Sequence, residues 1–107
     1  MAWMILLIAG LLEVAWAVGL KYSDGLSKPI PTVATVVTLL LSFWLLGLAM
    51  RDLPVGTAYG VWVGIGAVGT VILGIMLFDE ATNPSRLISI GFIIIGIIGL
   101  KLSTAEA

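Results

Sequence analysis

The sequence predicts an all-α integral membrane protein with four transmembrane helices. Of its 107 residues, 61% are hydrophobic and only 10% are charged, whereas soluble proteins average about 45–50% apolar and about 25% charged residues. The mean hydropathy is +1.23. A chain this short could not bury so much apolar surface in water, so the lipid bilayer is the solvent that fits it.

The charged residues divide the chain into four apolar segments that we expect to form one domain over residues 1–107. The N-terminus lacks the basic segment of a secretory signal, so we expect the first apolar segment to be retained as a helix. The prolines of Pro29-Ile30-Pro31 predict a loop over residues 21–31, and Pro54 stands where a helix start tolerates proline. The expected helices cover residues 2–20, 32–50, 55–78 and 85–102.

The basic residues give the chain almost no preferred orientation. Four spans place both termini on one side of the membrane, together with Arg51 and Lys101, and place Lys21, Lys28 and Arg86 on the other side. Because orientation follows this bias, we expect the chain to insert both ways. We expect Lys101 to extend toward the lipid headgroups, the alternative being that it faces a polar pocket.

Composition excludes several classes of function. The chain has no cysteine and no histidine, and its net charge is −1. Thiol chemistry, haem ligation and most transition-metal sites are therefore excluded, and nothing suggests nucleic-acid binding. We expect no metal, no cofactor and no enzymatic activity.

Glu13 is the candidate functional residue, since it lies in the middle of the first span. A carboxylate at that depth costs about 2.5–3.5 kcal/mol on insertion scales and usually marks a functional site. No charged residue lies deep enough in another span to pair with it. The simplest use is a carboxyl group that exchanges its proton for a cation, and the alternative is a permanently protonated acid that bonds a neighbouring helix.

Residues around Glu13 extend this candidate site. Trp16 lies three positions after Glu13 and so shares its helical face, while Gly10, three positions before, leaves space beside the carboxyl group. Ser42, in the middle of the second span, could orient a carboxylate. Its alternative is a hydrogen bond back to its own helix.

The third span repeats the aromatic spacing. Tyr59 and Trp62 are three residues apart, and Gly66 continues their face. Aromatic side chains beside a buried acid are suited to enclose an organic cation, although packing or an interfacial belt would explain each of them alone.

Small residues predict close packing between helices. Gly56, Gly60 and Gly64 recur every four residues in the third span, which is typical of small-xxx-small contacts. In the fourth span, Ser89 and Gly96 lie one heptad apart and offer a similar smooth face, which we expect to pack in a dimer.

Two segments carry a resemblance to a known family. Ala9-Gly-Leu-Leu-Glu13-Val-Ala-Trp16 and Gly56-Thr-Ala-Tyr59-Gly-Val-Trp62-Val-Gly64-Ile-Gly66 resemble the small multidrug resistance family, and length, spans and loops agree over essentially the whole chain. Trp16, Ser42 and Lys101 are similar to the guanidinium-exporter subtype of that family.

The resemblance implies proton-coupled antiport of guanidinium and its small substituted derivatives by an antiparallel homodimer in a bacterial inner membrane. It implies that Glu13 binds the proton or the cation, that Ser42 and Trp16 hydrogen-bond it, and that Tyr59 and Trp62 line the site. Gly64 and Gly66 then mark a kink in the third helix. Val63 stands where the family often has Ser or Thr, and Gly60 where it often has Ala.

The residues themselves support part of this picture and leave alternatives open. Transporters commonly place a midplane site between inverted repeats, and two oppositely inserted copies of this chain would supply them. The alternatives are an exporter of bulky hydrophobic or polyaromatic cations, a passive cation pore, or an accessory membrane subunit. A pore would need rings of polar side chains, of which the second and fourth spans have few.

Overall fold

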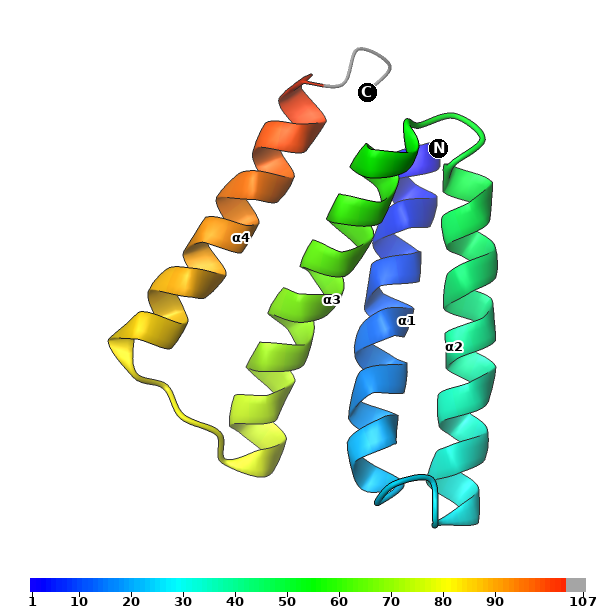
Figure 1. Cartoon of the computed structure of the whole chain (residues 1–107), viewed down its shortest axis with the longest axis vertical. Helices are drawn as coiled ribbons and strands as arrows, with labels where there is room; N and C mark the ends of the chain where they lie inside the picture. Colours follow the sequence, from blue (N-terminus) through cyan, green and yellow to red (C-terminus); the bar gives the residue numbers. More distant parts are fainter. Residues whose placement is uncertain (104–107) are drawn as a thin grey trace.

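A computed structural model describes residues 1–103, which form four helices that run alternately up and down (Figure 1). Each has the length and composition to cross a bilayer, since about 20 residues span its hydrocarbon core. The prediction of an all-α protein with four spanning helices is therefore confirmed. The helices are α1 (Ala2–Tyr22), α2 (Pro29–Ala49), α3 (Val55–Phe78) and α4 (Pro84–Ser103).

The expected start of α2 at residue 32 is wrong, because the helix begins at Pro29. The first turn of a helix has no intrahelical acceptors for its N–H groups, so prolines in that turn lose no hydrogen bond. Lys28 is extended and caps the helix, and its carbonyl accepts the Thr32 N–H at 3.1 Å. The connection between α1 and α2 is consequently shorter than residues 21–31.

That first connection is a compact turn built around a buried serine. The Ser23 hydroxyl donates to the Leu20 carbonyl at 2.7 Å and accepts the Leu26 N–H at 3.0 Å. Asp24, Gly25 and Leu26 all have positive φ, which reverses the chain within three residues. The turn therefore holds α1 and α2 together as a hairpin.

Helix α1 packs against both α2 and α3, whereas the backbone of α4 approaches that of α3 alone among the described helices. Figure 1 shows α4 at the outer edge, on the side of α3 away from α2. Helix α4 has no buried residue. The core lies between α1, α2 and α3 toward the end where the chain begins, and consists of Ala2, Leu6, Ala9, Leu46, Ala49, Leu53, Ala58, Val61 and Trp62.

Candidate functional site

Glu13 lies half-buried on α1 and is directed at the backbone of α3. Its neighbour there is Gly66, where an added Cβ would stand 2.8 Å from Glu13 Cγ and would overlap the carboxyl group. The absence of a side chain at Gly66 thus gives the carboxyl group its place. Glu13 Oε1 is buried and has no hydrogen-bond partner among the described residues. A buried acceptor without a partner is costly and uncommon in folded proteins, and it is suited to receive a donor.

Gly10 and its neighbours pack α1 closely on α3. A Cβ on Gly10 would lie 2.6 Å from Ile65 Cγ2, and one on Gly69 would overlap Val14 in the same way. Gly10 therefore makes room for Ile65, and the space that we expected beside the carboxyl group is filled by this side chain.

Ser42 is fully buried and joins three helices through one hydroxyl group. It donates to the Ala9 carbonyl of α1 at 2.7 Å and accepts the Trp62 Nε1–H of α3 at 2.9 Å. Regular helix geometry pairs that same carbonyl with the Glu13 amide. Ser42 thus contacts the backbone that carries Glu13, and the bond to the Glu13 carboxyl group that the resemblance implies is not formed in this structure.

Trp62 forms an aromatic cluster with Tyr59 and Phe43. Its ring centroid lies 5.6 Å from each of the other two, in tilted arrangements. Trp62 is 5% exposed, whereas Tyr59 is 54% exposed. The structure thus brings Tyr59 and Trp62 together as expected from their spacing. Phe43 was missed, since its position beside Ser42 in an apolar helix gives no signal in the sequence.

Trp16 supplies a second unpaired polar atom on α1. The indole is half-buried, and its Nε1 is buried without a hydrogen-bond acceptor among the described residues. It lies one turn along from Glu13, whose Oε1 is an unpaired acceptor. The helix therefore presents a free donor and a free acceptor on one face.

Helix α3 continues without interruption through Gly64 and Gly66. In this structure each of the two glycines allows close packing of α3 against a different neighbouring helix. Gly66 faces Glu13 of α1, and a Cβ on Gly64 would lie 2.8 Å from Ile97 Cδ1 of α4. The kink that the resemblance implies stays a prediction.

The small residues of α4 face away from the rest of the chain. A Cβ on Gly96 would meet nothing within 4 Å, and the exposed Ser89 hydroxyl donates to the Ser85 carbonyl of its own helix at 2.8 Å. Val63, on α3, is 38% exposed. Packing of Ser89 and Gly96 against a second chain stays a prediction, and so does the effect of Val63 on the range of substrates.

Comparison with known proteins identifies the family. Residues 1–93 match the family described as Small Multidrug Resistance protein. The chain belongs to the small multidrug resistance family. A guanidinium exporter of Escherichia coli (strain K12) is 62% identical over 104 residues, which cover 97% of this chain and 99% of that protein.

Further relatives of this small multidrug resistance protein have similar coverage. A guanidinium exporter of Shigella flexneri is also 62% identical, and one of Citrobacter freundii is 58% identical, both over 97% of this chain. The resemblance drawn from the two sequence segments is confirmed. With four spanning helices and exporters as relatives, the chain is a multi-pass protein of the inner membrane.

Proposed function

We propose that this protein is a proton-coupled antiporter that exports guanidinium and small substituted guanidinium cations. The observation that carries the proposal is the 62% identity to a guanidinium exporter over nearly the full length of both chains. The buried carboxyl oxygen of Glu13, which has no partner among residues 1–103, supports it independently. An acid inside a span is a proton-binding group, and the same oxygen atoms can bind a cation once the proton has left.

The chemistry of guanidinium suits this site. A guanidinium ion is planar and presents N–H donors in a fork that matches a carboxylate in two parallel hydrogen bonds. Glu13 accepts these bonds, and the Nε1–H of Trp16, which has no acceptor among the described residues, is available to donate to the carboxylate when the cation is bound. Trp62 and Tyr59 offer aromatic faces, which attract cations and stack on planar ones. Protons and cations then compete for the same carboxylate, which is the basis of exchange.

We propose further that the transporter is an antiparallel homodimer with both copies of Glu13 in one central site. Two oppositely inserted chains supply the inverted repeats that a single chain lacks. The even distribution of basic residues between the two sides supports insertion both ways. The uncovered face of α4 with Ser89 and Gly96 supports a helix–helix contact there. The two carboxyl groups then titrate as one coupled pair.

Transport currents on a solid-supported membrane test this function. Under the same pH gradient, guanidinium and singly alkylated guanidiniums should give currents, and tetraphenylphosphonium should give little or none. Tetraphenylphosphonium has no N–H donors, so it would leave buried polar groups unpaired at a cost of about 1–3 kcal/mol each. Glu13→Gln should abolish the currents, whereas Asp52→Asn, at an exposed carboxylate in the α2–α3 turn, should leave them unchanged.

Each alternative function predicts a different result. Equal or larger tetraphenylphosphonium currents would assign the protein to the exporters of bulky aromatic cations, for which the apolar Val63 would be a suitable wall. Conductance without proton exchange would indicate a pore, and neither current nor exchange would indicate an accessory subunit. Wild-type currents in Glu13→Gln would overturn the role of this carboxyl group.

A further inference from the structure

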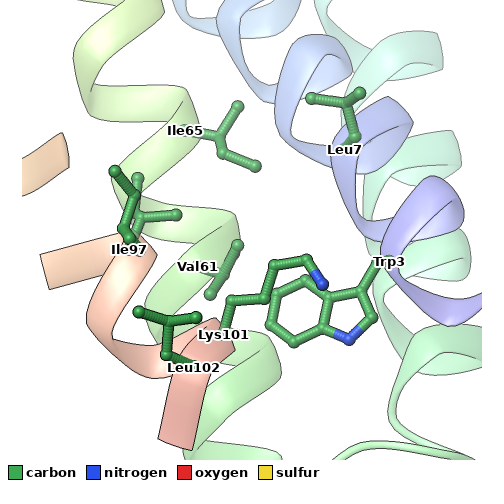
Figure 2. Close-up of a pocket in the computed structure, with 8 residues that line it drawn as sticks. Trp3, Leu7, Val61, Ile65, Ile97, Lys101 and Leu102 are labelled. Carbon is green, nitrogen blue, oxygen red and sulfur yellow. The ribbon is translucent and has the colours of Figure 1, made fainter. Parts of the chain in front are cut away.

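A cavity of about 260 Å³ lies between α1, α3 and α4, apart from the residues assigned to transport. Its lining is almost entirely apolar, with Leu7, Val61, Ile65 and Ile97 among the side chains, and it also includes Trp3 and Lys101. Figure 2 shows Lys101 extending from α4 toward α1, so that its ammonium group lies over the indole of Trp3. Lys101 Nζ is 4.9 Å from the centroid of the Trp3 ring.

The polar and apolar parts of this cavity lie at different depths in the membrane. Trp3 is in the first turn of α1 and Lys101 is in the last turn of α4, which is the headgroup level of a spanning helix. Leu7 and Ile97 each lie one turn further toward the hydrocarbon. The cavity therefore has a cation at the membrane surface and an apolar interior below it. This arrangement is complementary to an amphiphile with an anionic headgroup and an apolar tail.

The cation at this cavity has no anionic partner within the described residues 1–103. Lys101 is exposed and forms no ion pair with the described residues, and Trp3 Nε1 is buried without an acceptor among them. The ring of Trp3 attracts the ammonium group, but it does not neutralise the positive charge. Lys101 thus offers an ammonium group, beside the indole ring of Trp3, to a ligand that carries negative oxygen atoms.

A second cavity at the opposite end of the helices provides an internal comparison. It measures about 180 Å³, and Lys21 Nζ lies 5.6 Å from the centroid of the Phe78 ring at its wall. The lining of this cavity includes Glu80, whose Oε1 also forms an ion pair with Arg86 Nη2 at 2.7 Å. Lys21 therefore has a carboxylate in its own cavity, whereas no carboxylate is among the described residues that line the larger cavity.

We propose that the cavity beneath Lys101 and Trp3 binds an anionic phospholipid of the bilayer, with one acyl chain in the apolar interior and the phosphate on the Lys101 ammonium group. Basic pockets between spanning helices are known to bind anionic headgroups. An apolar cavity of this size does not favour water and does bind apolar groups. The exported cation is a poor occupant, because Lys101 would repel it.

Native mass spectrometry of the purified protein tests this site with two lipids that differ only in headgroup, dioleoyl phosphatidylglycerol and dioleoyl phosphatidylcholine. The wild type should retain the phosphatidylglycerol about fivefold more than the phosphatidylcholine, the ratio expected for one lysine near anionic headgroups. Lys101→Gln should bring the two to equal retention. Lys21→Gln, the matched lysine over an aromatic ring, should keep the wild-type preference.

Further variants separate the site from general surface charge and from misfolding. Leu7→Trp fills the cavity from an exposed position, so it should lower retention of both lipids. Guanidinium binding should stay at the wild-type level in Lys101→Gln, which reports a folded protein.

Four results would overturn the proposal. Lys101→Gln could keep the preference for phosphatidylglycerol, or Lys21→Gln could lose it to the same extent. Oleate could displace the phosphatidylglycerol at equal concentration, which would make a free fatty acid the occupant. Finally, the wild type could retain neither lipid, which would mean that another element, such as a second copy of the chain, fills the cavity.

Discussion

Replacing Gly66 with alanine should disable Glu13 while leaving α3 folded. Gly66 is buried in the interior of α3, where alanine is favoured over glycine by about 1 kcal/mol in intrinsic helix propensity. The added methyl group, however, would occupy the position of the Glu13 carboxyl group. The change in helix propensity acts on stability, and the added methyl group acts on the carboxyl group that binds the cation. Stability should therefore change little, whereas cation binding should weaken.

The size of the effect follows from the contact distances. Glu13 Cγ would lie 2.8 Å from the new Cβ, and ordinary contact begins at 3.4 Å, so this atom alone must move by about 0.6 Å and the carboxyl group by more. The end of a side chain can yield without moving the backbone, which keeps the cost in stability small. A displaced carboxylate loses charge-assisted hydrogen bonds worth about 1.5–3 kcal/mol, which corresponds to about 10- to 150-fold weaker guanidinium binding.

Isothermal titration calorimetry of guanidinium into the purified protein measures this change. Gly47→Ala is the matched control, because its Cβ would meet nothing within 4 Å in α2 and it brings the same gain in helix propensity. Gly66→Ala with an affinity within twofold of wild type would refute the reasoning, as would an equal loss in Gly47→Ala.

Three further predictions concern the supporting structure. Ser42→Ala should lower stability by about 1–3 kcal/mol, because it leaves Trp62 Nε1 and the Ala9 carbonyl without their shared partner, and an unchanged unfolding midpoint in a detergent titration would contradict this. Two lysines added to the α1–α2 connection should drive most copies into the orientation with that connection in the cytoplasm, and C-terminal reporter fusions that show one strong orientation in the unmodified protein would refute the dual insertion behind it. Gly96→Leu should lower the cross-linked dimer fraction at unchanged helix content, since the added side chain has free space within the chain, and an undiminished dimer fraction would exclude this face from the contact.

The four helices could be predicted because hydropathy and charge are local properties of the sequence. Helix α2 starts three residues before the predicted position, because the first turn of a helix accepts the two prolines that predict a loop there. Glu13 could be singled out for the same local reason, because a charge inside an apolar segment is conspicuous without any tertiary information.

The contacts of the site could not be predicted, because they depend on which helix faces meet. Nothing in the sequence indicates that the Glu13 carboxyl group packs against Gly66, or that the Ile65 side chain fills the space at Gly10. Ser42 was recognised as a polar residue in an apolar helix, but its bonds to Ala9 and Trp62 follow from the way α1, α2 and α3 pack. These are long-range relations, which spacing within one helix does not encode.

Proton release on cation binding tests the central claim, that the Glu13 carboxyl group exchanges a proton for guanidinium, most directly. Guanidinium added to the purified protein in weakly buffered solution near neutral pH should release protons in proportion to the cation bound. Asp52→Asn should release as many protons as the wild type, and Glu13→Gln should release none. Guanidinium binding without proton release in the wild type, or wild-type release from Glu13→Gln, would contradict the account.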